Sequence, residues 1–498
     1  MNTNSELERI VGGWLEGRVT EPPHGSLQAA LARVDGVQQQ RHRWLPVWPP
    51  SVDDRRSMFR ASALLAGAVG LVVTATIIVP RVAFEPDRPP QVSGSTWTVA
   101  AQGADFSTIG EAVTVAQDGD TILVAPGSYG EAFSIDRDIT LRGTGDEPGD
   151  VIVSIPGHAP ATSEALPPLS TTLHGSETPA HPPVGVQLLA TSATLTNLQV
   201  IGLDDGLAVL VRGGSPTLDS VVVSHARFLG CGGPPCVTDG DSQPTDVEAE
   251  VFAGALFVLD GAEVTVDGSR ITHTIRVDGG SSLRIHDGFL VYPSIAVQGS
   301  STLHLDGSSV WACEGPPLSV TGGSAAAVRD NQFWDGGIDV RGTIGTRTSA
   351  TIEGNTFSSA PDEAVYVTTG AEATIVGNRF HGNGHGVTVS HAGAIVRDNG
   401  FVSNTTAVNL MGADAQVAGN TISAGDMGIS IVMSGAPEIR DNTVERLASR
   451  GIFVGGGTRP TIEGNTACDS GVDLYIEPSA HPVMGDNDIC IEGPAVGG

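Results

Sequence analysis

An asparagine recurs at nearly constant spacing through the last third of the chain, and this period restricts the fold more than any other feature of the sequence. Eight asparagines follow one another at intervals of 21 to 24 residues. They are Asn331, Asn355, Asn378, Asn399, Asn420, Asn442, Asn465 and Asn487. A period of this length indicates one short structural unit repeated along an axis, so we expect a solenoid instead of a single globular core.

The residues around each asparagine indicate what the repeated unit is. An aliphatic residue usually stands three positions before the asparagine and an apolar one two positions after it, as Val396 and Phe401 do around Asn399. Later in most repeats, two aliphatic residues are separated by one position, as in Val387 and Val389, which places both on one face of a β-strand. Leucine-rich and helical solenoids need patterns that these repeats lack. We therefore expect an all-β fold, a single-stranded parallel β-helix with stacked aliphatic side chains inside.

The repeat also predicts contacts between neighbouring coils, which would lie about 4.8 Å apart. The aligned asparagines are expected where a strand bends, in the left-handed conformation they tolerate, with amides that hydrogen-bond along the axis. Cys468 and Cys490 each follow such an asparagine by three residues. We expect them at matching positions, within disulfide distance. Cys231 and Cys236 are candidates for a small closed loop, which leaves Cys313 free.

Upstream the period is less regular, and it begins with a distinctive segment, TWTVAAQGADFSTIGEAVTVAQDGDTILVAPGSY. Its amphipathic run 106–116 is expected to cap one end of the solenoid. Together with the asparagines, this segment resembles the opening of the pectin-lyase-like superfamily of right-handed parallel β-helix proteins, over nearly all of residues 96–490. The resemblance implies the right-handed fold only, because the superfamily contains lyases, hydrolases, esterases, epimerases and proteins without known chemistry.

Before the repeat lies an uncharged stretch of 20 residues between Arg60 and Arg81. As a helix it would span about 30 Å, the thickness of a bilayer core, so it predicts one transmembrane helix; a buried helix of a soluble domain is the alternative. Arginines crowd its N-terminal flank and favour a cytoplasmic N-terminus. All five cysteines then lie outside, where disulfides persist. The N-terminal segment resembles the short cytosolic segments of bacterial anti-sigma-type membrane proteins, but it has no cysteine for their zinc site.

The expected organisation places a β-helix beyond a single membrane span in a bacterial cell-membrane protein, with the large C-terminal domain extracytoplasmic. Two insertions, near 156–183 and 225–250, are expected to interrupt its coils as loops able to wall a groove. The segments are a cytosolic helical tail 1–60, a transmembrane helix 61–80, a Pro-rich linker 81–95, the β-helix 96–490 and a C-terminal tail 491–498.

Charge narrows the choice of partner. The chain has 56 acidic residues against 26 basic ones, all arginine, for a formal net charge of -30. Nucleic acid is excluded as a partner, because phosphate contacts need clustered cations. Polyuronates are disfavoured unless calcium bridges the charge, so a neutral glycan fits better. Calcium binding stays an open alternative. Carboxylate oxygens that could hold Ca²⁺ are present, although without the spacing of a defined calcium-binding loop, on Asp239, Asp241, Asp246 and Glu248. The histidines of the first insertion do not have the spacing of zinc ligands; they are His158, His174 and His181. We therefore expect no metal or other cofactor.

The stretch NGHGVTVS contains a Gly-His-Gly triplet that resembles a short polygalacturonase motif. The acidic and lysine-containing motifs of those enzymes are missing, and the only Asp-Asp pair past the membrane, Asp204 and Asp205, lies far upstream. In the repeat, His385 aligns with Glu363, Thr406, Met427, Arg450 and Val472, and a small residue follows in five of these six coils. We therefore interpret His385 as an exposed turn residue and assign no catalytic residues.

One cluster of chemically capable residues stays open as an alternative. The repeat would gather on one face Asp339, Asp362, Glu363 and His385. Paired carboxylates can do acid and base work on a glycosidic bond. We favour a membrane-anchored surface protein that binds a carbohydrate or another envelope component without catalysis. The alternative is a polysaccharide lyase or glycoside hydrolase acting on extracellular glycans.

Overall fold

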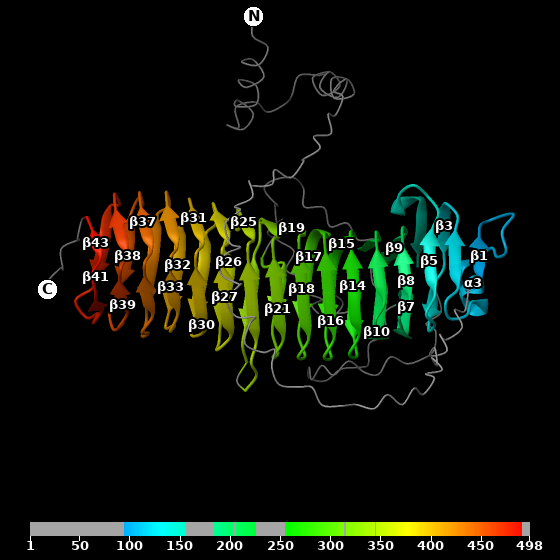
Figure 1. The fold of residues 1–498 in the computed structure, drawn as a ribbon, viewed down its shortest axis with the longest axis horizontal. Coiled ribbons are helices and arrows are strands. Elements are labelled where there is room, and N and C mark those ends of the chain that lie inside the picture. The colour runs from blue at the N-terminus through cyan, green and yellow to red at the C-terminus, as the bar shows by residue number, and fades with distance from the viewer. Residues whose placement is uncertain are drawn as a thin grey trace, which may run out of the picture. The chain divides into compact units, whose positions relative to one another are not determined.

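The computed structural model describes residues 94–155, 183–202, 206–225, 254–312, 315–343 and 345–490. These residues form an all-β solenoid of parallel strands, which confirms the predicted parallel β-helix (Figure 1). In the part of the chain that is described, no helix has the length and apolar character needed to cross a bilayer. The predicted tail, membrane span and most of the linker lie outside the described residues, as do the C-terminal tail and almost all of both insertions.

Most coils contain three strands, and equivalent strands of successive coils pair in parallel. Within the described residues the first strands form a sheet of 16. Its members are β1 (Thr96–Val99), β2 (Thr121–Val124), β5 (Thr140–Gly143), β8 (Thr194–Thr196), β11 (Thr217–Asp219), β14 (Glu263–Asp267), β16 (Ser282–His286), β18 (Thr302–Asp306), β21 (Ala325–Arg329), β24 (Ser349–Glu353), β27 (Glu372–Val376), β30 (Gly393–Arg397), β33 (Gln416–Ala418), β36 (Glu438–Arg440), β39 (Thr461–Glu463) and β42 (Val483–Met484).

The second and third strands of the coils belong to one larger sheet. Second strands are β3 (Gly127–Gly130), β6 (Val151–Ser154), β9 (Gln199–Gly202), β12 (Val222–His225), β19 (Ser309–Trp311), β22 (Gln332–Trp334), β25 (Thr356–Ser358), β28 (Arg379–His381), β31 (Gly400–Val402), β34 (Thr421–Ser423), β37 (Thr443–Glu445), β40 (Thr466–Cys468) and β43 (Asp488–Ile489). Third strands are β4 (Phe133–Ile135), β7 (Val184–Thr191), β10 (Leu207–Gly214), β13 (Gly254–Leu259), β20 (Leu318–Val320), β23 (Ile338–Arg341), β26 (Glu363–Thr368), β29 (His385–Ser390), β32 (Thr406–Met411), β35 (Met427–Val432), β38 (Arg450–Val454) and β41 (Val472–Ile476). Two long strands, β15 (Arg270–Val277) and β17 (Phe289–Val297), pair with both sets.

The core is a set of side-chain stacks along the axis. Phe333, Phe357, Phe380 and Phe401 stack in order, with ring centroids 4.8, 5.0 and 4.7 Å apart. The predicted cap is the short helix α3 (Ile109–Val115), which buries Ile109, Ala112 and Val113 against the first coils. A single 3-10 turn, η1 (Pro148–Asp150), precedes β6. Each fully buried aliphatic or phenyl side chain stabilises the solenoid by about 1.5 to 3 kcal/mol.

The asparagines form a continuous ladder of hydrogen bonds inside the turn between first and second strands. The side-chain amide of Asn378, for example, donates to Oδ1 of Asn399 at 3.0 Å and to the carbonyl of Ile352 at 2.9 Å. The predicted left-handed backbone conformation of the asparagines is wrong. The residue that adopts this conformation is the one before the asparagine, as at Asp398 with φ 58°. The chain bends there, which leaves the asparagine side chain free to point inward and bond the next coil.

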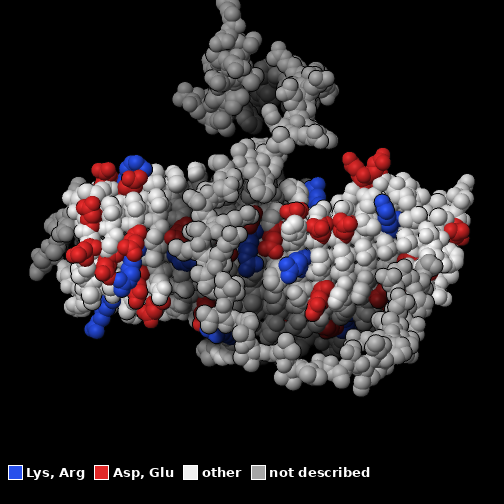
Figure 2. Space-filling model, in the orientation of Figure 1, with Lys and Arg blue, Asp and Glu red and all other residues white. Residues whose placement is uncertain are grey.

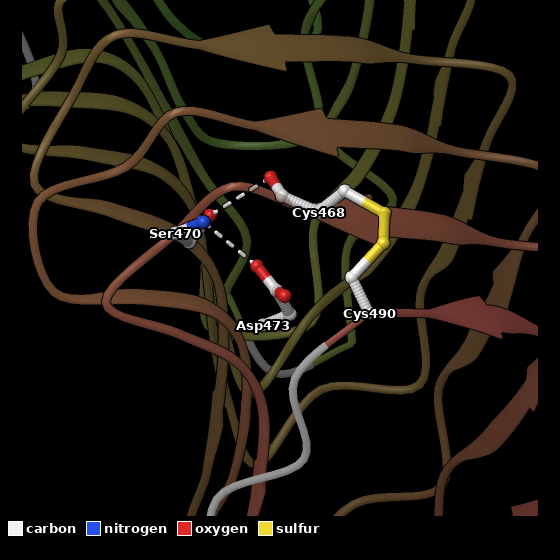
Figure 3. Close-up of a disulfide and its surroundings, with 4 residues drawn as sticks. All are labelled: Cys468, Ser470, Asp473 and Cys490. Atoms are coloured by element: carbon white, nitrogen blue, oxygen red, sulfur yellow. Dashed lines mark hydrogen bonds between the residues drawn. A yellow bond between two sulfur atoms is a disulfide. The ribbon is translucent and has the colours of Figure 1, made fainter.

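The C-terminal coils are joined by a disulfide between Cys468, at the end of β40, and Cys490, just after β43 (Figure 3). Their Cα atoms are 5.0 Å apart. In the turn that follows Cys468, the backbone N–H of Ser470 donates to Oδ1 of Asp473 at 2.8 Å. The other cysteines, Cys231, Cys236 and Cys313, lie outside the described residues.

Candidate functional site

A recess of about 170 Å³ opens where second strands turn into third strands on three successive coils. Three members of the predicted cluster line it: Asp339 on β23, Asp362 in the turn before β26, and Glu363 at the start of β26. Arg341 and Tyr366 complete the polar part of the lining. The fold therefore brings together residues that lie 24 positions apart, because each coil returns the chain to the same face.

Asp339 is the most unusual group in this recess. Its side chain is only 6% exposed, and its Oδ2 accepts a hydrogen bond from Nε of Arg341 at 2.7 Å. Its Oδ1 is buried and has no hydrogen-bond partner among the described residues. Burial raises the pKa of Asp339 above its ordinary value, although the charge and hydrogen bond of Arg341 oppose the shift. A buried, half-paired carboxyl is costly to keep, and such groups concentrate at functional sites.

Arg341 differs from Asp339 in its contact with solvent. Its side chain is 58% exposed although Nε is bonded to Asp339. Within the described part of the chain, its terminal guanidinium nitrogens make no hydrogen bond. The recess therefore presents N–H donors from Arg341 that are held in place by a buried carboxyl.

His385 is the neighbour of Glu363, which lines the recess. The two residues are partners in the register of β26 and β29, and His385 Nδ1 is 3.7 Å from Glu363 Oε1. His385 Nδ1 is also 3.2 Å from the hydroxyl of Thr388. The predicted alignment of His385 with Thr406 is the observed register, but the exposed-turn interpretation is wrong. His385 begins β29 and its side chain is 35% exposed, because the strand starts before its paired valines.

Asp339 also belongs to a line of residues on the outer face of the third strands, here called the outer column. Successive coils place in register Asp339, Tyr366, Thr388, Asn409, Ser430, Phe453 and Tyr475. Each stands between two inward aliphatic residues, as Tyr366 does between Val365 and Val367, which are fully buried. Every member is acidic, hydroxyl-bearing, amide or aromatic. In the sequence, the outer column is the residue between the two aliphatic residues of each pair. Its residue type changes from coil to coil, so no periodic pattern marks it.

An aromatic shelf ends the outer column. The rings of Phe453 and Tyr475 are stacked with centroids 5.8 Å apart. The guanidinium carbon of Arg450 lies 4.7 Å from the Phe453 centroid and 4.8 Å from the Tyr475 centroid. Cation–π contacts of this kind hold an arginine in place while its N–H edges stay free.

The described residues contain no group of three His, Cys, Asp or Glu side chains placed to hold a metal ion. The acids proposed as calcium ligands, Asp239 to Glu248, and the three insertion histidines lie outside the described ranges, as do Asp204 and Asp205. On the face shown in Figure 2, acidic side chains are scattered over the coils with arginines between them. The surface in that view thus gives no broad positive patch for a polyanion.

Two families match parts of this chain, each over less than half of its length. The family described as a right-handed beta helix region matches residues 336–489, and the family described as periplasmic copper-binding protein (NosD) matches residues 254–412. The β-helix is therefore right-handed. The described part of the second match gathers no group of three His, Cys, Asp or Glu side chains placed to hold a metal ion. A comparison with curated protein sequences finds no match.

Several solved structures are similar in fold. The catalytic unit of a GH87 alpha-1,3-glucanase from Streptomyces thermodiastaticus is 13% identical, with 78% of this chain and 66% of that chain covered and a TM-score of 0.37. The receptor-binding domain of the siphovirus 9NA tailspike is 12% identical, with 81% and 77% covered and a TM-score of 0.33. A polygalacturonase from Erwinia carotovora is 11% identical, with 80% and 94% covered and a TM-score of 0.29. This chain thus spans just under two thirds of the glucanase, and these likenesses carry no argument about activity.

Proposed function

We propose that this protein binds a carbohydrate on the outer face of its third strands, at the recess around Asp339, without cleaving it. The observation that carries the proposal is the pairing of Arg341 with a buried Asp339 next to Tyr366. Sugars present hydroxyl groups at their edges and C–H groups on their faces. A few fixed polar groups beside an aromatic ring suit such a ligand.

Binding is favoured over cleavage by the state of the buried acid. Oδ1 of Asp339 is shielded from solvent and Oδ2 is bonded to Arg341. Neither oxygen is placed to give a proton to a glycosidic oxygen, which a general acid must reach directly or through one water. The net charge of -30 favours a neutral glycan over a polyuronate.

A polysaccharide lyase or glycoside hydrolase remains the second candidate, and one observation favours it. Burial raises the pKa of Asp339, and Glu363 with His385 lies on the next coil. A protonated acid and an ionised carboxylate are the pair that glycoside hydrolysis uses. Release of new reducing ends from any bound glycan would favour this candidate.

We also propose that residues 61–80 anchor the protein in the cell membrane, with the N-terminus cytoplasmic and the β-helix extracytoplasmic. The arginine-rich flank supports this orientation. The Cys468–Cys490 disulfide suits an oxidising compartment. The ligand would then be an extracellular glycan or another envelope component. A reporter active only in the cytoplasm should work at the N-terminus and fail at the C-terminus, and the reverse result would overturn the orientation.

The binding proposal is tested by screening the full chain in detergent on an array of neutral and acidic glycans, with reducing-end analysis of each bound glycan. Arg341→Gln and Tyr366→Ala should weaken binding about tenfold or more, the scale of one lost hydrogen bond to a charged group. Arg397→Gln is a matched control, because Arg397 also pairs with an aspartate at 2.7 Å and is 53% exposed. Unchanged binding in both recess variants, or no bound glycan at all, would overturn the proposal.

A further inference from the structure

The geometry points to a second subsite of the same carbohydrate site, at Arg450, Phe453 and Tyr475, which takes a carboxylate carried by the glycan. This inference rests on the proposed function and adds the class of ligand: a largely neutral oligosaccharide with one acidic sugar. The recess and the aromatic shelf lie on the same outer column. Four coil steps separate Tyr366 from Phe453, which at about 4.8 Å per step is about 19 Å. One sugar cannot reach both, but an oligosaccharide can.

Small polar residues occupy the outer column between the two ends. They are Thr388, Asn409 and Ser430, of which Thr388 and Ser430 are buried and Asn409 is partly exposed, so no aromatic or aliphatic side chain of the column stands between Tyr366 and Phe453. The side chain of Asn409 is partly exposed, and within the described residues its amide makes no hydrogen bond. An amide with a free donor and a free acceptor can pair with a sugar hydroxyl in either direction.

Arg450 supplies the charge that selects the acidic group. Two arginines of nearby coils are paired with carboxylates, Arg440 with Glu438 and Glu463, and Arg446 with Glu445. The guanidinium of Arg450 contacts the two rings and, among the described residues, has neither a carboxylate nor a hydrogen-bond partner. A guanidinium held flat presents parallel N–H donors that match a carboxylate. The surrounding negative charge disfavours a polyanion, whereas a single carboxylate bound directly by Arg450 is compatible with it.

The test uses the full chain in detergent and two matched probes: glucose and N-acetylglucosamine hexasaccharides, each made in a neutral form and in a form that ends in glucuronate. Calorimetry at low salt should give about tenfold tighter binding of the glucuronate form, the scale of one charge-assisted contact. Arg450→Gln should abolish that preference and Tyr475→Ala should weaken it. Arg459→Gln, which removes an exposed arginine from the turn that follows β38, should keep it.

Two outcomes separate this inference from the proposed function. If wild type binds hexasaccharides through Arg341 but shows no preference for glucuronate, or if Arg450→Gln retains that preference, the second subsite is wrong and the recess stands. If no hexasaccharide or array glycan binds, both are wrong. Disaccharides of the same series should bind independently of Arg450, because they cannot reach from the recess to the shelf.

Discussion

The side-chain amide of Asn399 donates to Oδ1 of Asn420 on the next coil at 3.0 Å, and the backbone N–H of Asn399 donates to the same oxygen at 3.0 Å. One asparagine oxygen thus satisfies two donors of the preceding coil. The same pair of bonds recurs from Asn331 to Asn487. The ladder therefore fixes the register at every turn it passes, and its members are buried or nearly so.

Replacing Asn399 with Ala should lower the free energy of unfolding by about 1 to 3 kcal/mol, because two buried donors of Asn378 lose their acceptor. Urea unfolding followed by circular dichroism measures the change. Asn409→Ala is the control, since this asparagine lies on the outer face with no hydrogen bond in the described structure. Glu363→Ala, about a third exposed, should also cost little. Equal losses in all three variants would show that the ladder does not stabilise the fold.

Phe380 should be among the most sensitive core positions. It stacks between Phe357 and Phe401 and is almost fully buried. Phe380→Ala should cost about 3 to 5 kcal/mol through lost burial and the cavity left behind, and Phe380→Leu less. Phe453→Ala, which removes a phenyl ring from the outer face, is the control and should cost less than Phe380→Ala. A smaller loss at Phe380 than at Phe453 would contradict the assignment of inner and outer faces.

Reducing the Cys468–Cys490 disulfide should destabilise the C-terminal coils selectively. It closes a loop of 22 residues, for which loop-closure entropy gives about 3 kcal/mol. Because solenoid coils contact only their neighbours, amide exchange should rise in β40 to β43 and stay unchanged in β24 to β26. A Cys468→Ser, Cys490→Ser double variant should behave like the reduced protein. A uniform rise along the solenoid would argue against local unfolding.

The register was predictable because the core repeats with the coil. The aligned asparagines and the paired aliphatic residues are inward positions, so each coil must meet the same steric demand. The alignment of His385 with Glu363 followed from them and is the observed pairing. The sequence also contains a second, shorter asparagine ladder that the period did not predict. Asn383 and Asn404 are 21 residues apart, and the side-chain amide of Asn383 donates to Oδ1 of Asn404 at 2.9 Å.

The candidate site was less predictable because outer positions are free to vary. The spacing of two within β23 places Asp339 and Arg341 on one face of the strand, but nothing in it shows that Asp339 is buried, because burial depends on packing between coils. The shelf of Phe453 and Tyr475 has no counterpart on the coils before it, so it leaves no period. The left-handed backbone conformation of the residue before most ladder asparagines differs from the prediction, because asparagine itself tolerates that conformation.

The raised pKa of Asp339 predicts a pH-dependent stability difference. An acid whose pKa is higher in the folded state lowers stability as pH rises through that pKa, whereas asparagine cannot ionise. Asp339→Asn should therefore gain stability relative to wild type between about pH 3 and 7, measured by urea unfolding at several pH values. Arg341 stays solvated in the variant because it is 58% exposed. Asp398→Asn, at an exposed aspartate, is the control, and a gap that narrows with rising pH would contradict the sign.

His385 separates the binding and catalytic interpretations of the recess. Its ring lies near Thr388 and Glu363, is about one third exposed and contacts neither Asp339 nor Arg341 by any hydrogen bond found in the described residues. If the site only binds, His385→Ala should change the free energy of unfolding by no more than about 0.5 kcal/mol. Glycan affinity should stay within about threefold, which corresponds to well under 1 kcal/mol.

If the site cleaves a glycan, His385 is placed to act on Glu363 and the outcome is different. His385→Ala should then reduce turnover by about 10² or more, the usual scale for disturbing a general acid or base, while the affinity for uncleaved glycan stays constant. Reducing-end assays with the full chain, run beside His391→Ala as a histidine control on the same coil, measure this directly. We expect no turnover in wild type. Cleavage that disappears in His385→Ala but persists in His391→Ala would replace the binding interpretation by a catalytic one.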